Sequence, residues 1–346
     1  MVKALVTGGT GFVGSHIVRA LLAAGHSVRV LHRTTSKLDA LTGLQFESAM
    51  GDLDDLDALK AACDGCEWVF HVAAVADYWR ADRTKMFKAN VDGTRHICMA
   101  AQQTGVKRVI FTSSAAGLGM NEGRPSDETT AFNLSPDDFP YGYSKALAEH
   151  VVAEFVADGL DVVTVNPVVV MGPGDLNMIS GSFITQIKQL QWLTPLTSGG
   201  LAVVDVRDVA RGHLAAAERG RTGERYILGA TNIPYTQWFA MIAETVGVAK
   251  PFIMLPDVVP PLVARAIDLL RSAGIETVID ANQARLGTRK VYFNYDKAWS
   301  ELGTPQIDMR QSLHDTYAWY LAYGYIQETM LENAIRQIGK LIGIRR

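Results

Sequence analysis

The sequence predicts an α/β fold: a doubly wound parallel sheet with helices on both of its faces, joined to a smaller, interleaved C-terminal domain. Two observations carry this prediction. In the first half of the chain, short runs rich in β-branched residues alternate with amphipathic stretches, a pattern typical of repeated strand–helix–strand units. The chain has 346 residues, of which 48% are hydrophobic and 20% charged, which suits one large domain with a smaller partner.

The expected elements follow one another in strict alternation up to residue 170. The expected strands are KALVTGG (3–9), SVRVLH (27–32), LQFESAMGD (44–52), EWVFHVAA (67–74), KRVIFTSS (107–114) and DVVTVNPVVV (161–170). The expected helices are FVGSHIVRALLAAG (12–25), which Gly25 ends, LDALKAAC (56–63), MFKANVDGTRHICMAAQQTG (86–105) and YSKALAEHVVAEFVADG (143–159). Binding sites in such sheets lie outside the carboxyl ends of the strands.

After residue 171 the pattern loosens, because GPGD, LTPLTSGG, NIPY and PDVVPP interrupt it. Two later stretches, VVDVRDVARGHLAAAERG (203–220) and ERYILGA (224–230), again look like sheet-linked elements. We therefore expect a first domain of residues 1–170 with further sheet elements at about 201–230. Residues 171–200 and 231–328 are expected to form the second, substrate-binding domain, and 329–346 a separate C-terminal helix.

Charge and cysteine content exclude several classes of protein. The formal net charge of −3 gives no general attraction to nucleic acid or to an anionic membrane. No export signal and no apolar run of membrane-spanning length is evident, so we expect a cytoplasmic protein. Cys63 and Cys66 have the spacing of half a zinc site or a redox pair, but no second pair lies nearby. We interpret them as small apolar residues at a turn and expect no metal.

A glycine-rich turn follows the first expected strand. Gly8, Gly11 and Gly14 precede a helix, where glycines permit a tight turn and let backbone N–H groups approach a pyrophosphate. The strand before, the helix after and a second strand ending about twenty residues on make this a Rossmann-type dinucleotide-binding pattern. The alternative is a glycine-rich packing turn without a ligand.

Several motifs in order resemble those of one enzyme family along nearly the whole chain. They are TGGTGFVGSHI, GDLDD, FHVAA, NVDGT, FTSSA, YGYSK, NPVVVMGPGD and VVDVRDVARGH. Together they resemble the extended short-chain dehydrogenase/reductases, which include nucleotide-sugar epimerases, dihydroflavonol reductases and 3β-hydroxysteroid dehydrogenases. FHVAAVADYW and GERYILGA are most similar to bacterial dihydroflavonol-reductase-like proteins, among them those called hopanoid-associated sugar epimerases.

The end of the second expected strand bears on the choice of cofactor. An Asp or Glu there would accept hydrogen bonds from the ribose hydroxyls of NAD, but the aligned residue is His32. Arg33 follows it, and Lys37 adds a second cation. A guanidinium binds a phosphate through two hydrogen bonds, so the sequence favours NADP(H) over NAD(H). An ordinary solvated basic turn is the alternative.

The resemblance also implies a set of cofactor-binding residues. They are Gly8, Thr10, Gly11, Phe12, Val13 and Gly14 in the turn, His32, Arg33 and Lys37 after the second strand, Asp52 and Leu53 at the adenine, Ala73 and Ala74 at the ribose and diphosphate, Ser113, Tyr141 and Lys145, Pro167, Val169 and Val170 at the nicotinamide, and Ser182 at the diphosphate.

The reacting residues are expected in and before YGYSK. Tyr141 and Lys145 are four residues apart, so they share one helix face, where an ammonium favours the tyrosinate form of a phenol. By resemblance Ser114 orients the substrate carbonyl, and Asn90 lies in the helix under the active site. A helix-surface asparagine without a function is the alternative for Asn90. Tyr143 is a rival phenol, but no lysine lies four residues after it.

Three hypotheses for function follow. The first is an NADPH-dependent reductase whose small-molecule carbonyl substrate is a largely apolar ketone or aldehyde. The second is a nucleotide-sugar epimerase or dehydratase. The expected substrate residues are Tyr78, Trp79, Met120, Asn121, Tyr143 and Met171, with residues near Phe183 and Trp192. Leu201 stands where nucleotide-sugar enzymes usually place an arginine for the diphosphate, which favours the reductase. A non-enzymatic NADP-binding regulator is the third. The family suggests a homodimer built from the helices of 86–105 and 143–159.

The C-terminal stretch MLENAIRQIGKLIGIRR looks additional to the family core. Its apolar residues recur at helical spacing: Leu331, Ala334, Ile335, Ile338, Leu341 and Ile342. Arg336, Lys340, Arg345 and Arg346 add positive charge. Such a helix packs on protein or lies in a membrane interface, and we favour packing on protein.

Overall fold

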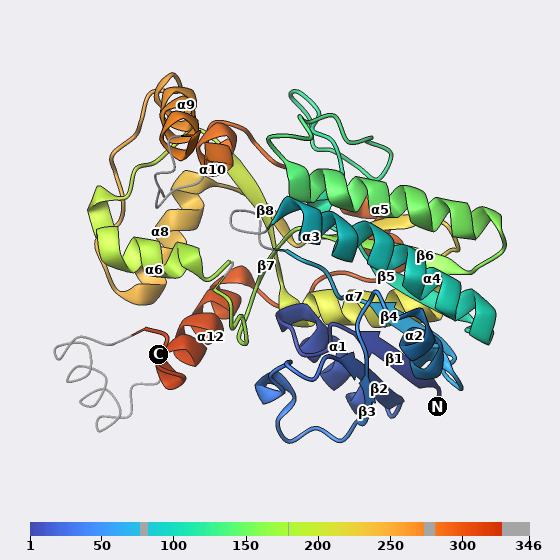
Figure 1. Ribbon diagram of the computed structural model, residues 1–346. Coiled ribbons are helices and arrows are strands. Elements are labelled where there is room, and N and C mark those ends of the chain that lie inside the picture. Colours follow the sequence, from blue (N-terminus) through green and yellow to red (C-terminus); the bar gives the residue numbers. More distant parts are fainter. Residues whose placement is uncertain (77–81, 179, 273–280, 327–346) are drawn as a thin grey trace, which may run out of the picture.

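A parallel sheet of seven strands forms the centre of the molecule in the computed structural model, which describes residues 1–76, 82–178, 180–272 and 281–326 (Figure 1). The strands lie in the order β3-β2-β1-β4-β5-β6-β9, and every neighbouring pair is parallel. Their bounds are β1 (Lys3–Thr7), β2 (Ser27–His32), β3 (Glu47–Met50), β4 (Trp68–His71), β5 (Arg108–Thr112), β6 (Val162–Pro167) and β9 (Arg225–Leu228). The chain runs outward from β1 to β3 and returns to β4 on the other side of β1, so the predicted doubly wound sheet is confirmed.

Helices cover both faces of this sheet. One face carries α1 (Phe12–Ala23) and α7 (Val206–Arg219), and the other carries α2 (Leu56–Cys63), α4 (Gly93–Thr104) and α5 (Pro140–Ala157) (Figure 1). Successive strand residues enter opposite cores: in β1, Ala4 and Val6 pack under α1 and α7, whereas Leu5 packs under the other helices. Each fully buried Val or Leu side chain contributes about 1.5–3 kcal/mol, so this alternation holds both layers on the sheet.

A second sheet of three strands lies beside the first and is built mainly from later parts of the chain. In it β8 (Gly200–Asp205) pairs in parallel with β7 (Val169–Met171) and antiparallel with β10 (Thr231–Pro234). Its core also includes residues of α6 (Ser182–Leu190), α8 (Tyr235–Val246) and α12 (Met309–Ala322). The remaining described elements are α3 (Arg83–Phe87), α9 (Val259–Ser272), α10 (Ala281–Leu286), α11 (Asp296–Glu301), and the short helices η1 (Asp39–Leu41), η2 (Lys88–Asp92), η3 (Ala115–Gly117) and η4 (Gln191–Leu193).

The prediction of a single strand at 161–170 is wrong. It divides at Val168, whose N–H donates to Leu228 O at 3.1 Å, and the chain then passes from β6 in the large sheet to β7 in the small one. The two later stretches expected at 203–220 and 224–230 supply strands to different sheets: β8 belongs to the small sheet and β9 to the large one. The division of the chain into two domains at residue 170 stays a prediction.

Two expected helices differ in their limits. The helix expected at 86–105 consists of α3, the wide π-helical turn η2 and α4, and Gly105 ends it with a positive φ of 72°. The helix expected from residue 143 begins at Pro140, because proline is well suited to the first helical position. Tyr141 therefore lies inside the first turn of α5.

Other expectations concern cysteines, membranes and the chain end. Cys63 and Cys66 are free and buried on either side of a turn, and burial raises the pKa of the Cys63 thiol to about 12. Within the described ranges no cluster of metal-ligating side chains occurs, and no helix is long and apolar enough to cross a membrane. The expected C-terminal helix at 329–346, and the predicted substrate residues Tyr78 and Trp79, lie outside the described residues.

Candidate active site

The carboxyl ends of the central strands bring the predicted site residues to one edge of the sheet. The glycine turn follows β1, Ala73 and Ala74 follow β4, and Ser113 and Ser114 follow β5. Because β1, β4 and β5 are adjacent and parallel, these segments lie side by side above the same edge.

The glycine turn is shaped for a ligand's backbone contacts. Gly8 has a φ of 70°, and a Cβ built on it would lie 2.7 Å from Ala73 Cα and N. A Cβ on Gly14 would lie 2.1 Å from Gly8 O, so neither position accepts a larger residue. Helix α1 begins after Gly11 with no side-chain cap and no acidic residue in its first turn. Its N–H groups and positive dipole end therefore fit an anionic diphosphate.

Gly8→Ala should abolish cofactor binding and strongly destabilise the fold. An alanine with positive φ costs about 1–2 kcal/mol, and the new methyl would also overlap the backbone of Ala73. Gly25→Ala is the matched control, since Gly25 has a φ of 80° with nothing within 4 Å of a built Cβ. For Gly25→Ala, urea unfolding should show only the backbone penalty in the free energy of unfolding, and NADPH titration should show no loss of affinity. Equal losses in both variants would contradict the crowding of Gly8.

A buried histidine connects three elements beneath this turn. The Thr94 hydroxyl donates to Asn90 O at 2.6 Å, so it accepts from His71 Nε2 at 3.1 Å. His71 Nδ1 then accepts from the Thr7 hydroxyl at 2.8 Å, and Thr7 Oγ1 in turn accepts from Ala73 N at 3.2 Å. Burial lowers the pKa of His71 to about 3, which keeps the ring neutral and able to make both contacts. The FHVAA motif indicated Ala73 and Ala74, but no local pattern in the sequence indicates this role of His71.

Asn90 is buried rather than on a helix surface, with 1% of its area exposed. Its Oδ1 accepts from Val75 N at 2.8 Å, and its Nδ2 donates to Val75 O at 3.1 Å and to Ser144 Oγ at 3.0 Å. Ser144 donates to Tyr141 O at 2.7 Å. Asn90 therefore fastens the loop after β4 to the helical turn that carries Tyr141, while a direct role in chemistry stays a prediction.

Tyr141 and Lys145 lie one turn apart on α5 and are buried, with 7% and 3% of their areas exposed. Lys145 Nζ donates to Thr112 O at 2.9 Å and lies 5.3 Å from the centre of the Phe111 ring. Burial lowers the pKa of Lys145 to about 8, and the nearby Glu149 carboxylate opposes that shift. The ammonium is thus held against the end of β5 at neutral pH.

Ser114 is brought towards this pair by close packing of α5 on the segment after β5. A Cβ on Gly142 would lie 2.3 Å from Ala116 O, and a Cβ on Gly117 would lie 3.2 Å from Lys145 Cβ. Ser114 itself is buried, and its Oγ accepts from Ala116 N at 3.2 Å. The two glycines therefore let the segment after β5, which includes Ser114, lie close to the helix that carries Tyr141 and Lys145. That the three residues form one catalytic site stays a prediction.

The predicted substrate residues have different surroundings. Tyr143 is half-buried, and its ring lies 6.0 Å from that of Phe87 and 5.9 Å from that of Phe132. Asn121 Nδ2 donates to Thr130 Oγ1 at 3.2 Å within the loop that also contains Met120. Met171 is buried in the core of the small sheet. Their contact with substrate stays a prediction.

The basic segment after β2 is open to solvent. His32 Nδ1 contacts Arg33 O at 3.1 Å, and Arg33 N donates to Ser36 Oγ at 3.1 Å, which folds the chain into a turn. Arg33 and Lys37 are exposed, and neither forms an ion pair with a described residue. Both cations are therefore available to an anionic ligand.

The residues predicted to bind the adenine and the diphosphate also make local contacts. Asp52 Oδ1 accepts from Leu53 N at 2.7 Å, and a Cβ on Gly93 would lie 2.8 Å from Leu53 Cδ1, which explains the glycine of NVDGT. His16 of α1 contacts Pro173 O at 2.9 Å, so the GPGD loop lies against the helix that follows the glycine turn. Whether Ser182, which begins α6, reaches a diphosphate stays a prediction, as do the nicotinamide contacts of Pro167, Val169 and Val170.

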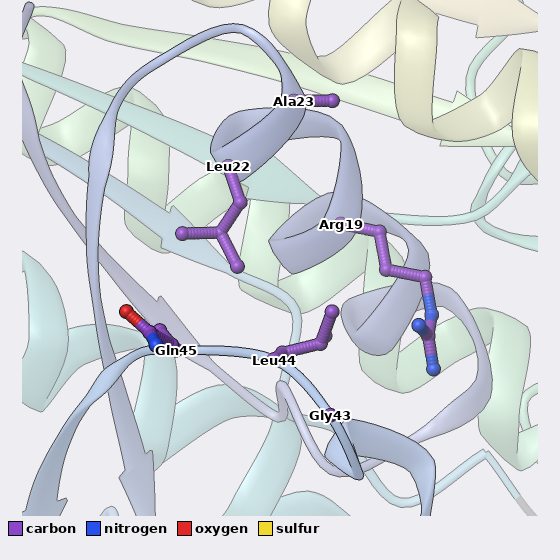
Figure 2. A pocket seen from close by; sticks show the side chains of 6 residues that line it. All are labelled: Arg19, Leu22, Ala23, Gly43, Leu44 and Gln45. Carbon is purple, nitrogen blue, oxygen red and sulfur yellow. The ribbon is translucent and has the colours of Figure 1, made fainter.

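A surface hollow of about 530 Å³ lies elsewhere, between α1 and the segment before β3 (Figure 2). It is lined by Arg19, Leu22, Ala23, Gly43, Leu44 and Gln45. Half of these residues belong to the part of α1 far from the glycine turn and half to the segment before β3, and none is a nucleophile or a general acid. This hollow is not the candidate site.

Comparisons with known proteins agree with this geometry. Residues 4–229 match the model of the NAD dependent epimerase/dehydratase family. The chain belongs to that family. A relative from Synechocystis sp., provisionally named dihydroflavonol 4-reductase, is 36% identical over 93% of this chain and 95% of its own. Sterol demethylase protein B from Methylococcus capsulatus is 32% identical over 93% of this chain and 99% of its own.

Solved structures of the epimerase/dehydratase family share the fold. The crystal structure of a nucleoside-diphosphate-sugar epimerase from Pseudomonas aeruginosa is 27% identical, covers 94% of this chain and 99% of its own, and superposes with a TM-score of 0.78. The resemblance to extended short-chain dehydrogenase/reductases is therefore confirmed, and the protein is an NAD(P)-dependent enzyme of the oxidoreductase type.

Proposed function

We propose that the protein is an NADPH-dependent carbonyl reductase that acts on a largely apolar ketone or aldehyde. The observation that carries this proposal is the buried Tyr141–Lys145 pair on α5 beside the end of β5. The exposed Arg33 and Lys37 after β2 support NADPH as the reductant, because they suit a 2′-phosphate. The names of the two relatives, a dihydroflavonol reductase and a sterol demethylase protein, support an apolar substrate.

The reaction assigns one task to each side chain. The glycine turn would hold NADPH, which when bound would supply the hydride. Ser114 Oγ donates a hydrogen bond to the substrate carbonyl and orients it, while Tyr141 Oη delivers the proton to the carbonyl oxygen. The Lys145 ammonium stabilises the tyrosinate that this transfer leaves, and it is present below about pH 8, where burial has lowered the lysine pKa.

A nucleotide-sugar epimerase or dehydratase is the second candidate, favoured by the likeness to the Pseudomonas aeruginosa epimerase. Leu201 argues against it. That residue is buried in the core of the small sheet with 4% of its area exposed, at the position where such enzymes usually carry a diphosphate-binding arginine. The cationic turn after β2 also favours the reductase, because selection of NADP suits a reductant that is exchanged after each turnover, whereas an epimerase returns the hydride to its own substrate.

Substrate profiling with NADPH separates the two candidates. A panel of flavonoid, steroid and aliphatic ketones, together with nucleotide sugars, is incubated with the enzyme and followed by NADPH absorbance and product analysis. The reductase should consume one NADPH for each ketone reduced. Conversion of a nucleotide sugar without net NADPH consumption, and no ketone reduction, would overturn the proposal in favour of the epimerase.

Assembly and location complete the proposal. The family resemblance favours a homodimer built from α4 and α5, which lie next to each other on one face of the sheet (Figure 1). For residues 329–346, packing on protein remains our favoured hypothesis and contact with a membrane interface the alternative. We retain the cytoplasm as the expected location.

A further inference from the structure

A largely buried carboxylate, that of Glu149, lies one helical turn beyond Lys145. Glu149 has 10% of its side-chain area exposed and receives hydrogen bonds from three elements of the large sheet. Its Oε1 accepts from the Ser113 hydroxyl and, at 2.6 Å, from Asn166 Nδ2, while its Oε2 accepts from Arg225 Nη1 at 2.9 Å. Ser113 follows β5, Asn166 lies in β6 and Arg225 begins β9.

The same contacts reach the serine predicted to orient the substrate. Asn166 Nδ2, which donates to Glu149, also donates to Ser114 O at 3.2 Å. Glu149 and Asn166 together therefore fix both residues that follow β5. A buried carboxylate is costly unless it is paired and hydrogen-bonded, and this one has a cation and two neutral donors. The arrangement is more than packing requires, since an apolar residue could fill the same space.

The charge of Glu149 also acts on Lys145. Burial lowers the pKa of Lys145 to about 8, and Glu149 is the charged group that raises it. Two histidines near the ammonium are neutral: His71 stacks on the Phe111 ring, and His213 of α7 contacts Thr112 Oγ1 at 2.9 Å. Burial lowers the pKa of His71 to about 3 and of His213 to about 4. Tyr141 on α5 and Arg225, paired with Glu149, complete this environment.

We propose that Glu149 is a positioning residue of the active site: its carboxylate ties α5 to β5, β6 and β9, and its charge holds Lys145 as an ammonium. The positive charge of Arg225 partly offsets the charge of Glu149. This inference rests on the proposed function only for its kinetic consequences, because the protonation of Lys145 can be observed without any substrate.

The direct test is NMR titration of protein labelled with ¹³C at lysine Cε. The Lys145 signal is identified by its absence in Lys145→Met. In Glu149→Gln the midpoint of the Lys145 titration should fall by about 1 pH unit, the usual scale for losing a nearby opposite charge. In Arg225→Gln it should move the other way. Glu149→Asp keeps the charge and should restore a midpoint near that of the wild type.

Glu154→Gln is the matched control, because Glu154 is on the same helix but exposed and paired with Arg95 at 2.8 Å. It should leave the midpoint unchanged. The alkaline limb of kcat/KM for carbonyl reduction should shift with the Lys145 midpoint in each variant. An unchanged midpoint in Glu149→Gln, or shifts of the same sign in Glu149→Gln and Arg225→Gln, would overturn the inference.

If Glu149→Gln does not fold, the titrations of Arg225→Gln and Glu149→Asp show whether the Lys145 midpoint shifts. Another outcome separates the inference from the proposed function. If the midpoints move as expected but no variant and no wild-type protein reduces a carbonyl compound, the inference stands and the proposed reductase function fails.

Discussion

Tyr141→Phe is expected to reduce turnover about 10²-fold or more while NADPH affinity remains almost unchanged, since that is the usual scale for loss of a positioned acid. The substitution removes only the phenolic oxygen. The ring stays buried in the first turn of α5, and the contact of Lys145 with Thr112 O does not depend on the hydroxyl. Hydride can still be positioned, but no group delivers the proton to the substrate oxygen.

Tyr143→Phe provides the control for Tyr141→Phe. Tyr143 lies two residues away on the same helix, is half-buried and contacts Phe87 and Phe132 through its ring, which the substitution preserves. Steady-state kinetics should show a much smaller change in kcat for this variant, and NADPH titration should give similar affinities for both. If both variants lose turnover equally, the assignment of Tyr141 as the acid is wrong.

Arg33→Asp should weaken NADPH binding by several kcal/mol and reverse the preference towards NADH. Arg33 is exposed at the end of β2 and forms no ion pair with a described residue, so its guanidinium is free to bind a 2′-phosphate. A hydrogen bond to a charged group is worth about 1.5–3 kcal/mol, and the new carboxylate would in addition repel the phosphate dianion. The same carboxylate could accept hydrogen bonds from the ribose hydroxyls of NADH.

Lys107→Asp is the matched charge reversal. Lys107 is exposed, forms an ion pair with Glu67 at 2.7 Å, and precedes β5 at the amino end of the strands, opposite the candidate site. Fluorescence titration of both cofactors should show no change in preference for this variant. Tighter binding of NADH than of NADPH by the wild-type protein would end the claim of NADP specificity.

Local pattern was sufficient to predict the elements and much of the candidate site. Short β-branched runs predicted the strands of the large sheet, and the spacing of Gly8 and Gly14 predicted a turn that the structure shows to be crowded by backbone. The four-residue spacing of Tyr141 and Lys145 predicted a shared helix face. These inferences succeed because strand alternation, turn geometry and helical spacing depend on residues that are close in sequence.

Only the tertiary structure decided where the chain changes sheets and which polar groups meet. DVVTVNPVVV reads as one strand, yet Val168 separates β6 from β7, because each half pairs with a different later strand. Glu149 reads as an ordinary helical glutamate, but Arg225 contacts it from the edge strand β9. No local pattern identifies such partners: the order of strands in the sheet brings them together, and burial there makes an unpaired charge costly.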